Sequence, residues 1–321
     1  MRADDSGRGA HAGQAHLRRS TEGSKFSRRQ PFFGRWRQFA LAGLCCAAAS
    51  VALAESNTPT RTALKVCADP YSLPSSHKDG SGYENKIAEL FGRKLGLPVQ
   101  YEWFPQRIGF IRNTLTSNDT ADGAYKCDLV MSVVENFDMA APTRPYLHSA
   151  WAMVYIKGRG LDYIHSQQDL VSATPEQRAQ LRIGIWDKGP ATEWIAQNDL
   201  MERAVPYQSM SGDTKETPGQ IITRELVQDK INLTFVWGPI AGYYAKQIKD
   251  AQVQVIPLQN EAGARFDFQI AMAVRFADKR WKAQVNQLIK DNQQEIDAIL
   301  RDYGVPTLPL KVDPRLGSDD D

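Results

Sequence analysis

The pattern of apolar and polar positions predicts short buried strands that alternate with amphipathic helices. Residues 64–69 form the first apolar strand, and a polar loop at 70–81 follows it. The spacing of Ile87 and Leu95 predicts a helix that opens near Gly82 and ends at Gly96. Repeated along the chain, this alternation is typical of an α/β protein with mixed, mostly parallel sheets.

The rest of the chain continues the alternation. Further strands are predicted at residues 99–104, 127–132, 150–155, 181–186, 231–237, 253–257 and 266–275. Helices are predicted after capping sequences at 174–177 and 217–220, at 191–198, around 243–244, and on the apolar faces at 281–289 and 296–303. No internal repeat is present.

The first 54 residues resemble a secretion leader and not a part of the fold. Four arginines between positions 28 and 37 precede an apolar run at 39–53, and Ala52-Leu53-Ala54 has the small-x-small pattern of a cleavage site. The run is too short to cross a bilayer as a helix. We therefore predict a signal peptide with a long leader at residues 1–54 and a periplasmic mature protein. A retained amphipathic anchor is the alternative.

Removal of the leader changes the charge of the chain. The whole sequence has 39 basic and 37 acidic residues, and the leader holds nine and three of these, so the mature chain has a net charge of −4. No basic stripe with interleaved aromatic residues remains, so we expect no nucleic-acid partner. The mature chain is long enough for two lobes, and we expect no membrane span in it.

Cys67 and Cys127 are the two cysteines of the predicted mature chain. An even count in an oxidising compartment favours a structural disulfide. Both cysteines lie on predicted parallel strands that would be neighbours, and the alternative is two buried thiols. A bond between them would stabilise the fold by about 4 kcal/mol in the chain-entropy description.

Five segments carry a resemblance to one family. They are Val66-Cys67-Ala68-Asp69-Pro70, GYENKIA at 82–88, Pro-Gln-Arg at 105–107 with GFIRNTL at 109–115, TRPY at 143–146, and VWGPIAGYY at 236–244. The whole mature chain resembles a type II periplasmic solute-binding protein. Within that fold it is similar to the quinoprotein-dehydrogenase-associated proteins of the MxaJ/XoxJ type, and the second and fifth segments are the most specific.

The resemblance implies a two-lobe fold with a hinge and an inter-lobe cleft. It also implies a periplasmic accessory factor of a methanol or alcohol dehydrogenase that uses pyrroloquinoline quinone (PQQ). The chain itself would carry no cofactor, whereas the partner dehydrogenase would carry PQQ and a metal, calcium or a lanthanide. A c-type cytochrome is a further partner, and the cleft could take a small molecule or a peptide. The alternative is the substrate-binding component of an ABC transporter for a small solute.

The same resemblance gives the expected division of the chain. Lobe 1 would comprise residues 61–147 with 261–312, lobe 2 residues 148–260, and residues 313–321 a flexible tail. Two extended crossovers are expected near 146–149 and near 255–260. The main loop of lobe 2 is expected at 212–219.

Charged groups that bind amino acids in relatives are missing at the matching positions. Those proteins usually place an arginine after the third strand of lobe 1, where this chain has residues 134–140 without a basic side chain. They usually place an aspartate after a lobe-2 strand, where this chain has Trp237. A buried zwitterion without these partners is costly, so a free amino acid is an unexpected ligand unless Arg107 or Arg144 substitutes.

Several residues are candidates for contact with a ligand or partner. They are Tyr71, Tyr83, Glu84, Gln106, Arg107, Asn136, Asp138, Arg144, Gly189, Thr192, Trp237 and Tyr243. The turn at 189–192 could offer backbone N–H groups to an anion, and Trp237 could stack on a ligand. Each also has a structural interpretation: helix capping at 189–192, half-buried packing for Trp237, and a favourable helix dipole for Glu84.

The sequence also lacks the motifs of common enzyme sites. His77, His148 and His165 remain after cleavage and show no metal-ligand spacing, and there is no G-x-S-x-G or C-x-x-C-H motif. We therefore expect no catalytic residue and no bound metal. A dehydratase on the same fold would need an acid in the cleft, and Glu84 or Asp138 would be the residue to test.

Overall fold

The computed structural model describes residues 61–186, 189–208 and 217–311. These ranges belong to one compact unit, Thr58–Asp321. The predicted leader, the predicted tail at 313–321 and most of the loop at 212–219 lie outside the described residues.

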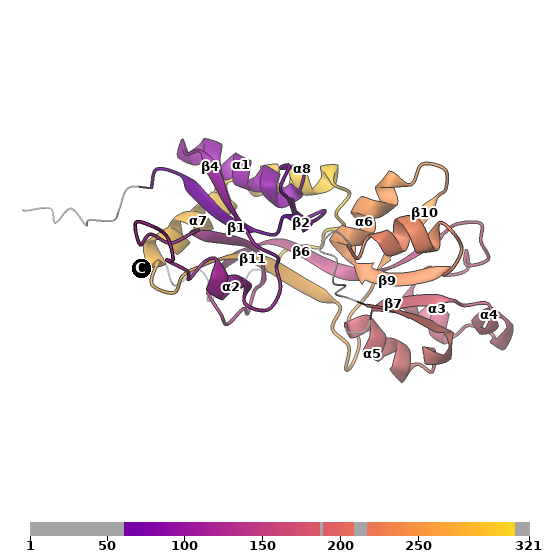
Figure 1. Cartoon of the computed structure of the whole chain (residues 1–321). Helices are drawn as coiled ribbons and strands as arrows, with labels where there is room; N and C mark the ends of the chain where they lie inside the picture. Colours follow the sequence, from indigo (N-terminus) through magenta and orange to yellow (C-terminus); the bar gives the residue numbers. More distant parts are fainter. Residues whose placement is uncertain (1–60, 187–188, 209–216, 312–321) are drawn as a thin grey trace, which may run out of the picture. The chain divides into compact units, whose positions relative to one another are not determined.

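Strands and helices alternate through the described ranges (Figure 1). The strands are β1 (Leu64–Ala68), β2 (Tyr71–Ser72), β3 (Ser76–His77), β4 (Val99–Trp103), β5 (Leu129–Val134), β6 (Ala141–Ile156), β7 (Ile183–Trp186), β8 (Ala204–Tyr207), β9 (Leu233–Trp237), β10 (Val253–Pro257) and β11 (Asp267–Val274). The helices are α1 (Tyr83–Leu95), α2 (Phe110–Asn113), α3 (Gln167–Val171), α4 (Pro175–Ala179), α5 (Pro190–Gln197), α6 (Gly238–Gln247), α7 (Lys279–Asp291) and α8 (Gln293–Asp302), with a 3₁₀ turn η1 (Met201–Arg203) and a π-helix η2 (Ile221–Leu226).

The main sheet is mixed and confirms the predicted α/β class. Its strand order is β4-β1-β5-β11-β6-β9-β7-β8, and β10 pairs with β6. Strand β1 runs parallel to β4 and β5 at one end of the order, and β7 runs parallel to β8 and β9 at the other. Between them, β11 and β6 pair antiparallel with each other and with their neighbours.

We propose that residues 61–147 with 261–312 form lobe 1 and that residues 148–260 form lobe 2, as predicted from the sequence. In lobe 1, helices α1, α7 and α8 cover one face of the sheet through a core that includes Phe91, Trp281 and Leu300. The opposite face holds a smaller core, to which the short helix α2 contributes Phe110 and Ile111.

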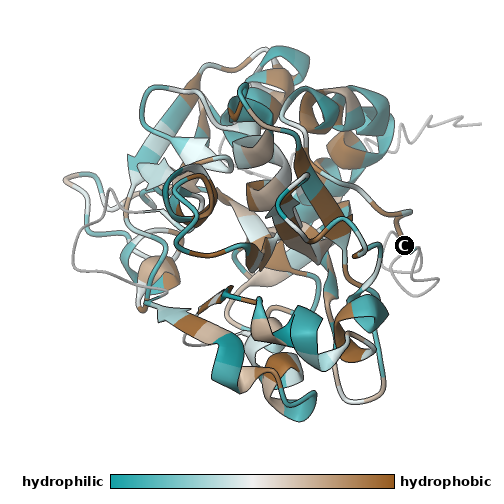
Figure 2. Ribbon diagram, turned by 90° about the vertical axis from the view of Figure 1, so that its right-hand side faces the viewer, coloured by the Kyte–Doolittle hydropathy of each residue, from teal (hydrophilic) through white to brown (hydrophobic). Residues whose placement is uncertain are grey.

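Lobe 2 has helices on both faces of its strands. Helices α3 and α5 pack on one face through Leu170, Trp194 and Ile195. On the other face, η2 and α6 contribute Leu226 and Ala241 to a separate core. Apolar residues concentrate along the strands in both lobes, while hydrophilic residues mark the outer sides of the helices (Figure 2).

Two segments cross between the lobes, β6 and residues 258–266 before β11, and a third, residues 305–311 after α8, lies against β6 at the hinge. The last of these returns along β6, since Leu308 N–H donates to the His148 carbonyl and Ser149 Oγ donates to the Pro306 carbonyl. His148 is buried, and its Nε2 lies 3.2 Å from Asp267 Oδ2 on β11. These contacts join the segment after α8 to β6, and β6 to the start of β11, at one level of the hinge.

Some predicted elements differ from the observed ones. The strand predicted to begin at Ala150 begins at Ala141, because the pairing with β11 shifts register next to Pro142 and Pro145 and so accommodates both prolines. The sequence around Thr217 predicted a capped α-helix. The structure has the π-helix η2 without a side-chain cap, and the Thr217 hydroxyl instead bonds Tyr244 Oη at 3.0 Å.

The disulfide predicted between Cys67 and Cys127 is present, with a Cα–Cα distance of 5.5 Å. Cys67 lies on β1, whereas Cys127 lies two residues before β5, the strand that pairs with β1. Both cysteines are buried in the smaller core of lobe 1. The bond therefore fixes the entry to β5 against the centre of β1.

Candidate functional site: a cleft between the lobes

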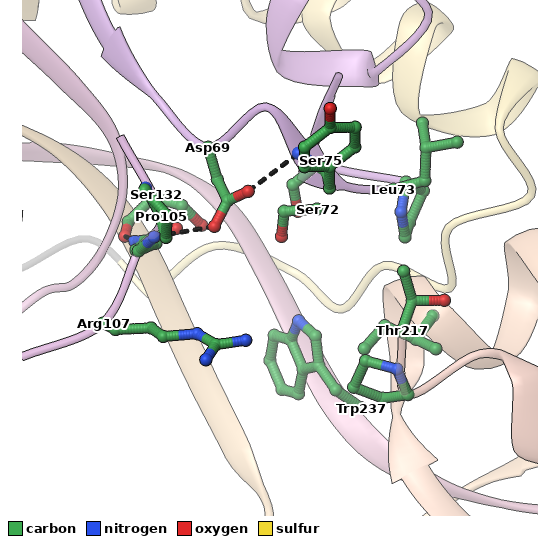
Figure 3. Close-up of a pocket in the computed structure, with 14 residues that line it drawn as sticks. Asp69, Ser72, Leu73, Ser75, Pro105, Arg107, Ser132, Thr217 and Trp237 are labelled. Atoms are coloured by element: carbon green, nitrogen blue, oxygen red, sulfur yellow. Dashed lines mark hydrogen bonds between the residues drawn. The ribbon is translucent and has the colours of Figure 1, made fainter. Parts of the chain in front are cut away.

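A pocket of about 300 Å³ opens between the two lobes (Figure 3). Its lobe-1 side consists of Asp69, Tyr71, Ser72, Leu73, Pro74, Ser75, Pro105, Gln106, Arg107 and Ser132, and its lobe-2 side of Thr217, Pro218, Trp237 and Ile240. The lobe-1 residues follow the carboxyl ends of β1 and β4 or end β5. Ligand sites of open α/β sheets form at this edge.

Asp69 organises the lobe-1 side. It follows β1 directly, and its carboxylate accepts the Tyr71 N–H at 2.8 Å and the Gln106 N–H at 2.6 Å. One side chain therefore holds the loops after β1 and β4 together. The Ser76 hydroxyl adds a bond to the Asp69 carbonyl at 2.8 Å.

Gln106 and Arg107 extend this wall toward lobe 2. The Gln106 amide donates to the Ser132 carbonyl at 2.9 Å and so ties its loop to the end of β5. The Arg107 guanidinium is exposed and points across the pocket toward the Trp237 indole (Figure 3). Asp69 and Arg107 are the charged residues among those that line the pocket.

Trp237 forms the centre of the lobe-2 side. It ends β9, is half-buried, and its ring packs edge-on against Phe268 with centroids 6.1 Å apart. Beside it, Gly219 lies against the Tyr244 ring so closely that a Cβ would come within 1.9 Å of it. Only glycine permits this approach, which brings the neighbouring Pro218 and Thr217 to the pocket edge.

The WGPIAGYY segment at 237–244 has glycines at two positions where the backbone comes into close contact with other chain segments at the hinge. A Cβ on Gly238 would lie 2.4 Å from the Ala150 carbonyl oxygen, and one on Gly242 would lie 1.8 Å from the Gly304 carbonyl oxygen. Helix α6 therefore packs directly on β6 and on the end of α8. Tyr243, next to Gly242, stacks on Tyr303 with centroids 5.9 Å apart.

A buried polar network lies behind the lobe-1 wall. Tyr146 Oη donates to Glu84 Oε1 at 3.2 Å, and Ser75 Oγ donates to Tyr83 Oη at 3.0 Å. Burial raises the pKa of Glu84 to about 7, while hydrogen bonds from Ser132, Tyr146 and Tyr83 oppose the shift. Ser75 and Ser132 line the pocket, so they connect the network to the cleft.

The predicted contact residues separate into two groups. Tyr71, Gln106, Arg107 and Trp237 line the pocket. Tyr83 and Glu84 lie buried behind it, Asn136 and Asp138 are exposed in the loop after β5, and Arg144 sits on β6 with its N–H bonded to Asn286 Oδ1. Gly189 caps α5, Thr192 donates to the Trp186 carbonyl at 2.6 Å, and Tyr243 packs on Tyr303.

Sequence reasoning missed several lining residues. Asp69 directly follows β1 and Ser132 lies near the end of the adjacent strand β5, and that position at the carboxyl edge is a signal that could have found them. Ser72, Ser75, Thr217 and Pro218 come from loops whose path depends on contacts distant in the sequence. Nothing in the local pattern distinguishes them from other loop residues.

Within the described ranges, no group of three or more His, Cys, Asp or Glu side chains is placed to hold a metal ion. In the same part of the chain, no helix is long and apolar enough to cross a membrane.

The fold and the cleft are those of a periplasmic binding protein. No protein-family model matches the chain. The periplasmic binding protein XoxJ from Methylobacterium extorquens AM1 is 30% identical, with 77% of this chain and 99% of XoxJ covered and a TM-score of 0.61. MxaJ from Methylophaga aminisulfidivorans MPT is 23% identical, with 76% and 100% covered and a TM-score of 0.63, and it supports the fold alone.

Sequence comparison agrees with the structural one. The protein MoxJ of Methylorubrum extorquens AM1 is 26% identical over 295 residues, which cover 84% of this chain and 92% of MoxJ. The chain belongs to the MxaJ/XoxJ-type family of periplasmic binding proteins and has the type II periplasmic-binding-protein fold.

Proposed function

We propose that this protein is a periplasmic accessory factor of a PQQ-dependent methanol or alcohol dehydrogenase. It binds the dehydrogenase through the cleft and supports maturation or activity of that enzyme. The dehydrogenase carries the PQQ and the metal, and its c-type cytochrome is a further candidate partner. The chain itself binds without catalysis.

Membership of the MxaJ/XoxJ-type family is the observation that carries this proposal. The composition of the cleft supports it. Its lobe-2 side presents Thr217, Pro218, Trp237 and Ile240, so none of the described lobe-2 lining residues is charged. Aromatic and arginine side chains anchor protein interfaces more often than other residues do, and Trp237 faces Arg107 across this cleft (Figure 3).

A binding role without catalysis is supported by how the ionisable groups are used. Both carboxylate oxygens of Asp69 accept hydrogen bonds from backbone N–H groups, at 2.8 and 2.6 Å. Glu84, whose pKa is raised to about 7 by burial, lies behind the pocket and not in its lining. A dehydratase needs an acid that reaches the substrate, and neither carboxyl is placed for that role.

The second candidate is a substrate-binding component of an ABC transporter. The pocket of about 300 Å³ favours it, because small-molecule sites begin at roughly this size. Asp69 and Arg107 also supply opposite charges to the same space. This candidate requires a free small solute to bind the wild-type protein.

The decisive experiment measures association with a PQQ-dependent methanol dehydrogenase from the same organism. Purified mature protein is passed over the immobilised dehydrogenase, and dehydrogenase activity is followed on mixing. Arg107→Ala and Trp237→Ala should each weaken association by about tenfold or more. Arg301→Ala and Phe276→Ala change an exposed arginine and an exposed aromatic residue outside the cleft, and should leave association unchanged.

The outcomes separate the two candidates. Association that is lost in both cleft variants supports the accessory role. A wild-type protein that ignores the dehydrogenase but binds a small solute at the cleft favours the transporter role. Association that persists in both cleft variants, with folding intact, removes the cleft from the proposal.

A further inference from the structure

A second pocket lies on lobe 1 outside the cleft. It has a volume of about 430 Å³, and its walls come from residues 106–111, from β5 and from residues 137–139. We call it the apolar groove. Apolar side chains such as Phe110, Val133 and Phe137 dominate its lining, and Arg107 is the charged residue among those that line it.

The groove exists because one face of the lobe-1 sheet has little cover. Three helices of ten or more residues pack on the opposite face, whereas this face has α2, which is four residues long. A largely buried sheet needs apolar cover on both faces. Val130 and Val133 of β5 therefore face a cavity where other α/β proteins have a helix.

Exposed apolar side chains surround this groove. Ile108 is 97% exposed, Met139 is 53% exposed and Val134 is 37% exposed. These are three of the seven large apolar residues that the described ranges leave exposed, and all three line the same pocket. Single exposed apolar residues need no explanation, but a cluster at a cavity marks an interaction site.

The groove is continuous with the cleft. Gln106, Arg107 and Ser132 line both pockets, so the loop after β4 is their common wall. The bonds from Asp69 to Gln106 and from Gln106 to Ser132 hold this wall in place. A segment seated in the groove must therefore pass Arg107 to reach the cleft.

We infer that the apolar groove binds a segment of a partner protein that presents a large apolar side chain next to a carboxylate. The apolar side chain fills the groove beside Val133 and Met139, and the carboxylate pairs with Arg107 at the cleft edge. The apolar lining sets the first requirement, and the positive charge of Arg107, the charged residue among the described ones that line the groove, sets the second. This inference rests on the proposed function and extends its interface beyond the cleft.

Two dyes of similar shape test the chemistry of the groove. Anilinonaphthalene sulfonate is an apolar anion, and N-phenyl-naphthylamine is its uncharged counterpart. Fluorescence titration of the mature protein should show saturable binding of both. Met139→Glu should weaken both by about tenfold, whereas Met201→Glu, at a methionine that is 42% exposed in η1, should stay within about twofold.

Arg107→Gln separates charge from apolar contact. It should weaken the anionic dye several-fold and leave the uncharged dye unaffected. Trp237→Ala, which changes the cleft and not the groove, should leave both dyes unaffected. Equal dye binding by the wild type and Met139→Glu, or equal responses of the two dyes to Arg107→Gln, overturns the inference.

The dehydrogenase association assay then tests the occupant. Met139→Glu should weaken association about tenfold, and Met201→Glu should not. If the wild type and Met139→Glu bind the dehydrogenase equally tightly, the inference is overturned and the proposed function still stands. Dye results as expected without any dehydrogenase binding support the groove and remove the proposed function. A wild-type dimer in sedimentation that Met139→Glu dissociates assigns the groove to a second copy, against the inference.

Discussion

The hydroxyl of Tyr146 donates a hydrogen bond to Glu84 Oε1 at 3.2 Å, and both residues are buried. Tyr146 lies on β6 and Glu84 opens α1, so the bond joins the long strand between the lobes to the helix beneath the cleft. Ser132, which lines the cleft, also favours the Glu84 carboxylate and so opposes the rise in the pKa of Glu84. The ionisation of one carboxyl therefore affects the hinge, the helix and the cleft wall together.

The first prediction concerns stability and pH. Burial raises the pKa of Glu84 from 4.5 to about 7. Because the folded-state pKa exceeds the unfolded-state value, the folded protein holds an extra proton in this window, and stability falls as pH rises through it. Relative to Glu84→Gln, the unfolding free energy of the wild type should fall by on the order of 3 kcal/mol as the pH rises from about 4.5 to above 7. Urea unfolding at pH 5, 6, 7 and 8 measures the difference.

Subtraction of the two curves cancels all other titrating groups. Asp267, for example, has its pKa lowered to about 2, chiefly by hydrogen bonds from Lys311 and Asn260 that outweigh its burial, and its effect falls below the window. Tyr146→Phe removes a donor that favours the carboxylate, so it should move the window to higher pH. A wild-type-minus-variant difference that is flat from pH 5 to 8 would contradict the prediction.

The second prediction concerns the disulfide. Protein isolated from the periplasm, denatured without reductant, should titrate no free thiol from Cys67 or Cys127, which are bonded in the structure. A bond that closes 60 residues of chain should contribute about 4 kcal/mol in the chain-entropy description. Reduction should therefore lower the unfolding free energy of the wild type and leave a Cys67→Ala/Cys127→Ala protein unchanged. Two free thiols in the unreduced protein would refute the bond.

Local pattern predicted those elements whose signals lie within them. Helix α1 has its apolar spacing and its terminal Gly96, and β10 was predicted with its observed bounds, Val253–Pro257. Other elements depend on their neighbours. Strand β6 includes Pro142 because β11 shifts register beside it, and β8 tolerates Pro206 because it lies at the edge of the sheet.

The candidate site was predictable to the extent that strand ends mark it. Trp237 ends β9 and Gln106 follows β4, and the carboxyl ends of these strands meet at the cleft. Glu84 opens a helix, and nothing in that local position predicts its burial or its hydrogen bond with Tyr146, 62 residues away in the sequence. The groove was not predicted, because the sequence around Ile108 and Met139 does not show whether these side chains are buried or exposed.

The third prediction concerns the loops at the cleft. Asp69→Ala leaves the Tyr71 and Gln106 amides without the acceptor they have at 2.8 and 2.6 Å. Hydrogen bonds to a charged group are worth roughly 1.5–3 kcal/mol, so we expect a loss of about 2 kcal/mol in unfolding free energy for these partly exposed bonds. Asp119→Ala, at an exposed loop residue, is the matched control.

Hydrogen exchange at single residues gives the sharper readout for Asp69→Ala. The amides of Tyr71 and Gln106 should exchange faster in this variant, while amides in the core of β1 keep their protection. Unchanged exchange at Gln106 would show that Asp69 does not hold the loop after β4.

The last prediction concerns free amino acids. The cleft presents Trp237 on its lobe-2 side, and its own carboxylate, Asp69, already accepts two backbone N–H groups. A buried ammonium would therefore lack a free partner, and its desolvation would cost more than the contacts return. Binding at a hundred times Kd adds about 2.7 kcal/mol of stability and raises the melting temperature visibly. A thermal-shift screen of the twenty amino acids should leave the melting temperature of the wild type and of Arg107→Gln unchanged. A clear rise with one amino acid, abolished by Arg107→Gln, would show that Arg107 supplies the missing clamp and would return the protein to the solute receptors.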